Sequence, residues 1–471
     1  MQTLLGLLAF IISLATGWLI ISILFSAKNR IPTLMHACLG YGLGLAINGE
    51  ATFISFLLFG HLNRYFVISA NAALLAVLAG LWIWLNKKRR EVRSLPNEKS
   101  GLNKKGFREF AFLALMLIPL CIQAQHYPDG GWDAWSVWNL KAKFLFLAGE
   151  NWQDIFSPIL WRSSPHYPLL LPLINVWGWC FLSEPAGTIP LITAITFTAI
   201  TAGLLFSMLK SCTKPAFAYL AIAAIMTNPL FLKLTSSQYS DIVFSYYLLA
   251  TISCLIMAKK TGLTAFSLMA GIFTGALSFT KPEGLVSAGI VIIIYLPYLL
   301  FRPQANKKVQ TNDVSIPSTP AKQATFAFIS GLIITSIIPA IFYFVYAPEN
   351  ITFANEITSQ PLLETLMRIR AIFYSYFLEL ININRWGGLW LILLTTLLLN
   401  QKKASDARII IIPIYIMIYI GITSLYYLIN TYFEINWWLK VTLDRILFAI
   451  LPTIILWVFY SAGEKQEGFN S

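Results

Sequence analysis

The sequence predicts an all-α integral membrane protein, with about 12–14 transmembrane helices in one polytopic bundle. Hydrophobic residues make up 57% of the 471 residues and charged residues only 12%, with a mean hydropathy of +0.68. A soluble chain of this length needs about a quarter of its residues charged to cover its surface. The charge deficit therefore indicates that lipid surrounds most of the molecule.

Apolar runs that can cross a bilayer recur along the chain. About 20 apolar residues span the hydrocarbon core as a helix, which satisfies its own backbone N–H and C=O groups. Examples are Thr3–Phe25, Phe66–Leu85, Leu285–Phe301, Ala324–Tyr346 and Ile409–Leu428. The first run has no basic leader and no small-residue cleavage site, so we expect a retained helix.

The net charge of +13 is concentrated in short links between the apolar runs. Nine Lys or Arg and two acids lie between Lys87 and Arg108. Further basic clusters begin at Lys28, Lys210, Lys259, Arg302 and Lys402. This pattern is typical of the positive-inside rule, so the basic links are predicted to be cytoplasmic. It argues against a nucleic-acid partner.

We expect a single membrane domain over residues 1–471. Residues 1–108 would form the N-terminal helices and a basic cytoplasmic loop, residues 109–462 the core, and residues 463–471 a polar tail. Within the core, residues 126–167 are predicted to be an extracytoplasmic loop that prolines divide into short juxtamembrane helices. Its five tryptophans are typical of the lipid headgroup region.

Two apolar segments are predicted to differ from simple crossings. Residues 168–183 are short, and all later basic links become cytoplasmic only if this segment does not cross, so we expect a re-entrant or juxtamembrane segment. Residues 367–400 have a possible break near Asn382–Gly388. No repeat symmetry of the transporter kind is visible.

Cysteine and histidine usage predicts neither disulfides nor a structural metal. The five cysteines are isolated in apolar surroundings, and the four histidines are scattered without HExxH spacing. We therefore expect no required cofactor and no metal ligands, with an optional divalent cation as the alternative.

Charged residues gather at the predicted outer ends of the helices. Charges at membrane depth are expensive and usually functional, so their convergence predicts an extracytoplasmic pocket that holds both signs. The residues are Asp129, Asp133, Lys141, Lys143, Arg162, His166, Asp241, Lys281, Glu283, Glu349, Glu356, Glu434, Lys440, Asp444 and Arg445.

Several short elements follow one another in this part of the chain. They are Asp133 before a short helix ending in Phe144-Leu-Phe-Leu-Ala-Gly149, then His166-Tyr-Pro-Leu-Leu-Leu-Pro172, Asn228-Pro-Leu-Phe231 with Ser240-Asp241, Thr280-Lys-Pro-Glu-Gly-Leu285, and Arg445-Ile-Leu-Phe-Ala-Ile-Leu-Pro452. In this order they resemble the GT-C superfamily of membrane glycosyltransferases, in particular its ArnT-like, Rgt-like and protein mannosyltransferase-like members (glycosyltransferase family 39-like). The resemblance covers most of residues 109–455.

The resemblance implies transfer of a sugar from a polyprenyl-phosphate donor to an acceptor hydroxyl, with inversion, at the extracytoplasmic membrane face. Asp133 would be the general base. Cations would stabilise the phosphate, first Lys281 and Arg445, then Lys141 and Arg162. Asp241 and Glu283 would hold the acceptor, orient a cation or bind the optional metal. His166, Tyr167 and Trp135 would contact the substrate.

The implied partners are the polyprenyl-phosphate sugar, membrane lipid, and a glycan, lipid or protein acceptor, with no nucleic acid. The implied location is the plasma (inner) membrane of a bacterium, as a multi-pass protein with its active site outside.

Each candidate residue also has a structural interpretation. Asp133 suits a helix N-cap, and Arg445 an ion pair with Asp444. Lys281 suits an interfacial pair with Glu283. In addition, Lys141 and Lys143 suit the solvated face of a surface helix, and His166 a loop hydrogen bond.

Two other functions stay open at this point. A transporter or lipid flippase would carry ionisable residues in mid-span and broken helices. Glu50, Glu379 and Arg385 are the candidates for such residues. A surface-polysaccharide polymerase or ligase would carry a late outer loop rich in Arg and His, whereas the longest loop here comes early and is rich in aromatic residues.

Overall fold

The computed structural model describes residues 2–25, 31–91, 104–300, 321–350, 361–404 and 409–463. Every regular element within these ranges is a helix, which confirms the predicted all-α class. Most of the predicted basic loop (residues 92–103), most of the basic linker after Arg302, and the tail from residue 464 lie outside the described residues. So does Glu356.

Residue contacts group the chain into two compact units. The first unit comprises Met1–Trp152, Leu170–Ser207 and Thr235–Tyr239. Its helices are α1 (Gln2–Leu24), α2 (Thr33–Phe59), α3 (Arg64–Glu91), α4 (Lys104–Gln125), the π-helix η2 (Ala134–Trp138), α5 (Asn139–Leu147), the start of the 3₁₀ helix η3 (Gly149–Phe156), α6 (Leu170–Trp179) and most of α7 (Thr188–Cys212).

The second unit comprises Gln153–Leu169, Met208–Leu234 and Ser240–Ser471. Its helices are η4 (Pro158–Ser163), α8 (Pro215–Met226), α9 (Pro229–Ser236), α10 (Ser240–Thr261), α11 (Thr264–Ser278), α12 (Pro282–Leu300), α13 (Ala321–Ile341), η5 (Phe342–Tyr346), α15 (Leu362–Leu380), α16 (Ile383–Trp386), α17 (Leu389–Leu399), α18 (Gln401–Ala404), α19 (Ile411–Ile429) and α20 (Ile435–Gly463). The last residues of α9 pass into the first unit.

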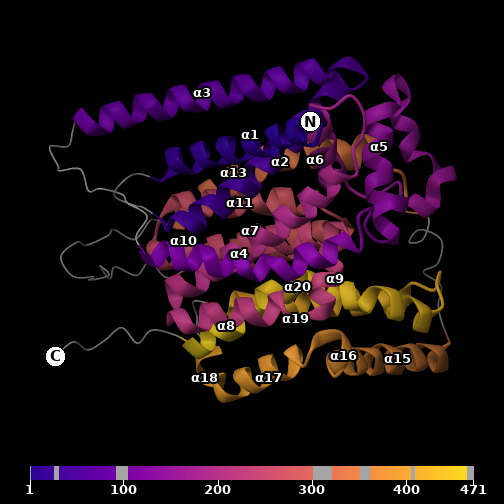
Figure 1. The fold of residues 1–471 in the computed structure, drawn as a ribbon. Coiled ribbons are helices and arrows are strands. Elements are labelled where there is room, and N and C mark those ends of the chain that lie inside the picture. The colour runs from indigo at the N-terminus through magenta and orange to yellow at the C-terminus, as the bar shows by residue number, and fades with distance from the viewer. Residues whose placement is uncertain are drawn as a thin grey trace, which may run out of the picture. The chain divides into compact units, whose positions relative to one another are not determined.

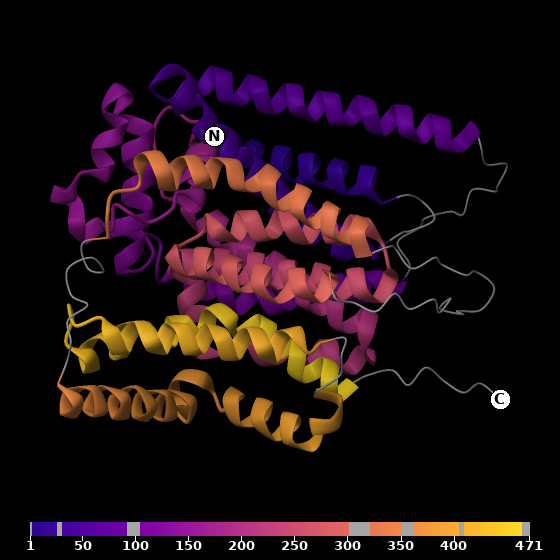
Figure 2. The ribbon, with the colours of Figure 1, turned by 180° about the vertical axis from the view of Figure 1, so that it is seen from behind.

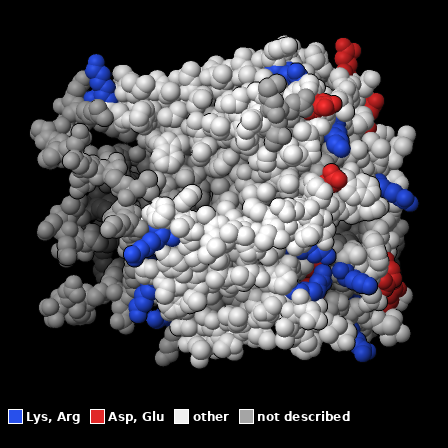
Figure 3. Space-filling view, in the orientation of Figure 1, with Lys and Arg blue, Asp and Glu red and all other residues white. Residues whose placement is uncertain are grey.

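Within the described residues, nine helices are long and apolar enough to cross a membrane, or ten if the bent pair α8–α9 is one span. Four shorter apolar helices accompany them. The broad middle of the face shown in Figure 3 is almost free of charged side chains, as lipid-facing surface requires. The chain is thus a polytopic helical membrane protein. The predicted number of 12–14 spans is reached only if shorter apolar helices also cross the membrane.

In the first unit, α1 and α2 lie side by side at very short distance (Figure 1). A Cβ atom on Gly17 would lie 1.6 Å from the Gly40 carbonyl oxygen, and one on Gly44 would lie 1.8 Å from the Ser13 carbonyl oxygen. Small residues thus allow backbone-to-backbone packing, the usual way helices associate in lipid.

The predicted loop at residues 126–167 consists of the short helices η2, α5, η3 and η4, in agreement with the prediction. The next helix, α6, has only ten residues and is buried along its whole length. It is shorter than a bilayer span, which agrees with the expectation that residues 168–183 do not cross.

In the second unit, α11 and α13 pack closely through glycines, and Figure 2 shows them side by side. A Cβ atom on Gly271 would lie 2.0 Å from the Phe328 carbonyl oxygen. Two other helices of this unit are broken. The apolar segment that begins at Pro215 forms the pair α8–α9, which is bent by 67°. The expected break near Asn382–Gly388 is present, because α15, α16 and α17 are separated there and Gly387 and Gly388 have positive φ angles.

Candidate functional site

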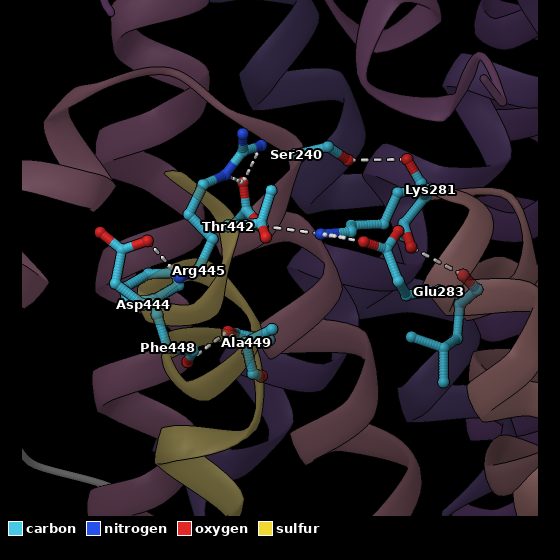
Figure 4. Close-up of polar contacts among 12 residues, drawn as sticks. Ser240, Lys281, Glu283, Thr442, Asp444, Arg445, Phe448 and Ala449 are labelled. Carbon is cyan, nitrogen blue, oxygen red and sulfur yellow. Dashed lines mark hydrogen bonds and ion pairs between the residues drawn. The ribbon is translucent and has the colours of Figure 1, made fainter. Parts of the chain in front are cut away.

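Four charged residues of the second unit form one ion-paired group, which we call the Asp241 cluster: Asp241, Lys281, Glu283 and Arg445. One carboxylate oxygen of Asp241 accepts from Lys281 Nζ at 2.8 Å. The other accepts from Arg445 Nη2 at 2.8 Å and Nε at 3.1 Å. Glu283 Oε1 lies 3.2 Å from Lys281 Nζ. Figure 4 shows Arg445 and Lys281 approaching the centre of the cluster from two sides, with Glu283 beside Lys281.

Asp241 is held at the start of α10. It lies in the first turn of the helix, where the exposed N–H groups favour a negative charge. The preceding Ser240 Oγ donates to the Thr280 carbonyl oxygen at 2.7 Å. This hydrogen bond ties the start of α10 to the link that carries Lys281.

Lys281 and Glu283 are placed by the tight link between α11 and α12. Pro282 begins α12, and the Gly284 N–H donates to the Lys281 carbonyl oxygen at 2.8 Å. A Cβ atom on Gly284 would lie 2.2 Å from the Leu277 carbonyl oxygen. The sequence Thr-Lys-Pro-Glu-Gly therefore forms this link because glycine alone allows the two helix ends to approach so closely.

Arg445 reaches Asp241 because α10 and α20 run in parallel register. One turn further along both helices, Ser245 Oγ donates to the Ala449 carbonyl oxygen at 2.8 Å. Asp241 and Arg445 each lie four residues before these partners, so they meet on the same face.

The centre of the Asp241 cluster is desolvated. The side chains of Asp241 and Lys281 are only 0% and 5% exposed. Burial acts to lower the pKa of Lys281, but the carboxylates of Asp241 and Glu283 outweigh it and raise the pKa above its ordinary value. Lys281 is thus a buried cation held by Asp241 and Glu283. The predicted pair with Glu283 is present, but Lys281 is buried rather than exposed at an interface.

Asp444 does not form the predicted ion pair with the side chain of its neighbour Arg445. Its carboxylate accepts the Arg445 backbone N–H at 2.8 Å and forms an ion pair with Arg385. Arg385 also bonds Glu379 at 2.8 Å, and Glu379 accepts from the Trp386 indole at 2.8 Å. A second polar group therefore lies beside the break between α15 and α17.

The two broken helices meet at their breaks. Asn228 Oδ1 accepts the Phe231 N–H and so caps α9, while Asn228 Nδ2 donates to the Trp386 carbonyl oxygen at 2.6 Å. Pro229 lies beside Gly387, 3.6 Å from where a Cβ atom would be. This gives the Asn-Pro-Leu-Phe element a defined role as a joint between two helix breaks.

The second unit separates its charges between the two ends of its helices. At the far end of α10, Lys260 Nζ donates to the Ser211 carbonyl oxygen at 2.9 Å, close to Lys210 and Lys214 in sequence. The Lys214 N–H donates to Gly463 at the end of α20. A lysine end therefore lies opposite the end that carries the Asp241 cluster.

In the first unit, Asp133 occupies the N-cap position of η2, yet its side chain makes no capping hydrogen bond. The capping interpretation of Asp133 is therefore wrong. The loop that carries Asp133 is held in place at Gly131, whose N–H donates to the Ser237 carbonyl oxygen at 2.9 Å. A Cβ atom on Gly131 would lie 2.3 Å from the Tyr239 hydroxyl, so a larger residue there would require the Tyr239 side chain to move.

A chain of buried polar side chains supports this loop. Gln238, whose φ is +59°, donates to the Pro128 carbonyl oxygen at 2.9 Å and accepts from Asn139 at 3.0 Å. Asn139 accepts from Asn175, which accepts from Thr193 at 2.8 Å. These residues had no motif in the sequence that could have revealed them, since only the fold brings them together.

The other candidates of the first unit differ in exposure. Lys141 is fully buried, which lowers its pKa well below the ordinary value, so a solvated surface position is wrong for Lys141. Lys143 is exposed, as that interpretation required. Trp135 is 51% exposed and lies edge-on against Trp132, with ring centroids 4.4 Å apart.

Three candidates lie in the segment Gln153–Leu169 of the second unit. Arg162 is exposed and lies over the Trp161 ring, at 5.2 Å from its centroid. His166 packs edge-on against Tyr167 at 4.9 Å. The structure thus brings Asp241, Lys281, Glu283 and Arg445 into contact, whereas Asp133, Trp135 and Lys141 belong to the other unit and their sharing of a pocket stays a prediction.

In the described part of the chain, no three His, Cys, Asp or Glu side chains gather in a way that could hold a metal ion. Comparison with protein-family models, with curated proteins and with solved structures found no match to this chain. The fold and the site therefore define a polytopic helical membrane protein with an ionic cluster. The cluster is formed at the starts of α10 and α12 and about three turns into α20.

Proposed function

We propose that this protein is a membrane glycosyltransferase of the GT-C type. It transfers a sugar from a polyprenyl-phosphate donor to an acceptor hydroxyl at the extracytoplasmic face of a bacterial plasma membrane. The observation that carries the proposal is the buried Asp241 carboxylate, which holds Lys281 and Arg445 in fixed positions. Buried charges at membrane depth persist where function requires them.

The cluster suits a lipid phosphate. Lys281 has three N–H donors and two carboxylate partners among the described residues, which leaves a donor for a third oxygen. Donors fixed in advance stabilise the charge that develops on a leaving phosphate more effectively than mobile ones. The opposite lysine end supports an orientation with the cluster outside the cytoplasm, by the positive-inside rule.

In this proposal Asp133 is the general base that takes the proton of the acceptor hydroxyl. Two features support the role. The carboxylate is not used as a helix cap, and the loop that carries it is fixed by Gly131 and the Gln238 network. A fixed position matters because an error of about 1 Å at the base can reduce the rate about a hundredfold.

The test is a transfer assay with purified protein in liposomes and a panel of polyprenyl-phosphate sugars. We expect Asp133→Asn to reduce transfer at least about a hundredfold, which is the contribution typical of a general base. Asp129→Asn, four residues earlier in the same loop, is the matched control and should retain most activity. Undiminished transfer by Asp133→Asn would eliminate Asp133 as the base.

A second comparison tests the phosphate site. Lys281→Ala should raise the KM for the donor and lower kcat, because the cation acts on both bound and departing phosphate. Lys260→Ala is the control, since Lys260 lies at the opposite, lysine end, where it donates to the Ser211 carbonyl oxygen and to Cys212 Sγ. Equal effects of the two substitutions would argue against the proposed site.

A transporter is the second candidate, and one observation favours it. The breaks of α8–α9 and α15–α17 are joined through Asn228, with Glu379, Arg385 and Asp444 beside them. Discontinuous helices with ionisable residues form the binding sites of many transporters. Uptake of a sugar lipid or its headgroup into proteoliposomes, without any transfer product, would favour this function over transfer.

A further inference from the structure

Two polar atoms beside the Asp241 cluster have no hydrogen-bond partner among the described residues. One is the Tyr419 hydroxyl on α19, whose side chain is fully buried. The other is Glu283 Oε2, which is buried although the side chain as a whole is 31% exposed. Buried polar atoms are rarely left without partners in folded proteins, so the pair calls for an explanation.

The two atoms lie on facing turns of α12 and α19. Tyr415 donates to Ser287 Oγ across this helix pair at 2.7 Å. Glu283 lies one turn before Ser287, and Tyr419 lies one turn after Tyr415. Phe244 on α10 packs against the Tyr419 ring, with centroids 6.1 Å apart, and its ring lies 5.8 Å from Lys281 Nζ, so Tyr419 lies on the cluster side of Tyr415. The two helices therefore run in opposite directions, and Glu283 and Tyr419 occupy the next level along the pair.

Glu283 is also the most weakly held member of the Asp241 cluster. Its contact with Lys281 is 3.2 Å, against 2.8 Å for Asp241, and its side chain is the most exposed of the four. With Glu283 in place the cluster is formally neutral, since Asp241 and Glu283 balance Lys281 and Arg445. Without it, the remaining three residues carry one positive charge.

We propose that Glu283 is a displaceable counter-ion of Lys281 and that Tyr419 is its alternative partner. A phosphate group that binds Lys281 displaces the Glu283 carboxylate, which turns to accept a hydrogen bond from the Tyr419 hydroxyl. The exchange gives both unpaired atoms a partner and makes the cluster cationic when the phosphate arrives. The inference rests on the proposed function for the identity of its ligand as a lipid phosphate.

The exchange predicts opposite effects of two substitutions on phosphate affinity. Glu283→Gln removes the competing charge, so phosphate should bind about tenfold more tightly. Tyr419→Phe removes the alternative partner of the displaced carboxylate, so phosphate should bind about threefold to tenfold more weakly. Tyr415→Phe, one turn away on the same helix face, should leave phosphate affinity unchanged.

The decisive variant is the double substitution Glu283→Gln with Tyr419→Phe. If Tyr419 acts only through the carboxylate, its loss has no effect once Glu283 is gone, and the double variant binds like Glu283→Gln alone. A merely structural role of Tyr419 would weaken binding equally in both backgrounds, and that result would overturn the proposal.

Binding is measured by isothermal titration of the purified full-length protein with geranyl phosphate, inorganic phosphate and phosphatidic acid. The exchange is supported if Tyr419→Phe weakens binding of any of these probes in the wild type but not in the Glu283→Gln variant. The probe that binds most tightly shows whether the site takes a prenyl phosphate, free phosphate or a phospholipid phosphate. No binding of any probe to the wild type overturns it. If the variants show this binding pattern but the protein transfers no sugar, the exchange is supported and the glycosyltransferase function is refuted. If the protein transfers sugar but the effects of the two substitutions are additive, the function is supported and the exchange is refuted.

Discussion

Asp444 and Arg445 are neighbours on α20, yet each side chain forms its ion pair with a different helix. Arg445 binds Asp241 on α10, and Asp444 binds Arg385 beside the break of α15–α17. The two residues therefore join α20 to the Asp241 cluster on one side and to the helix breaks on the other. Since α20 is one continuous helix over Ile435–Gly463, the position of Arg445 depends on both attachments.

Removing the carboxylate of Asp241 should destabilise the protein severely. Asp241→Asn leaves two buried cations without their shared counter-ion, which costs about 3–5 kcal/mol. Thermal unfolding in detergent measures the effect. The double variant Asp241→Asn with Lys281→Met should recover part of the loss, because it removes one uncompensated charge. A double variant no more stable than the single one would contradict this explanation.

Two tyrosines one turn apart should respond differently to removal of the hydroxyl. Tyr415→Phe breaks the 2.7 Å hydrogen bond to buried Ser287 and should cost about 1–2 kcal/mol. Tyr419→Phe removes a buried hydroxyl with no described partner, so stability should be unchanged or higher. Unfolding midpoints of the two variants test the contrast, and an equal loss in both would contradict it.

Two glycines of α12 form a second matched pair. Gly284→Ala forces a Cβ atom against the Leu277 carbonyl oxygen and should cost about 1–3 kcal/mol while displacing Lys281. Gly289→Ala meets no atom within 4 Å and should be neutral or stabilising by up to about 1 kcal/mol. Midpoints of thermal unfolding, together with donor KM, separate the two effects. Loss of donor binding in Gly289→Ala would count against the importance of the Gly284 contact.

The buried Lys141 should make stability depend on pH. Its pKa is lowered in the folded protein, so between that value and about 10.4 the unfolded chain binds a proton that the folded chain does not. Stability therefore rises with pH through this window, and the dependence disappears in Lys141→Met. We expect Lys141→Met to be more stable than the wild type at pH 7.

Unfolding midpoints between pH 6 and 9 provide the measurement, with exposed Lys143→Met as the control. A midpoint of the wild type that falls as pH rises, or a Lys141→Met variant with the same pH slope as the wild type, would contradict the prediction.

The sequence by itself determined the class of this protein and the places where it is irregular. Bilayer thickness and the need to satisfy backbone groups act on local composition, so hydropathy identified the long apolar helices and the possible break near Asn382. The positions of the basic links indicated that the short segment at 168–183 does not cross. Unusual polar residues between apolar runs likewise identified Asp241, Lys281, Glu283 and Arg445. Hydropathy and the placement of charges depend only on residues that are close in the sequence, so they can be predicted without the tertiary structure.

Only the tertiary structure decided which of these charges are partners. Arg445 was as compatible with Asp444 as with Asp241, and the parallel register of α10 and α20 made the choice. Arg385 and Asn228 likewise find their partners on helices that are distant in sequence. Partner choice depends on the register and direction of packed helices, which are set by the packing of the whole unit rather than by any segment alone.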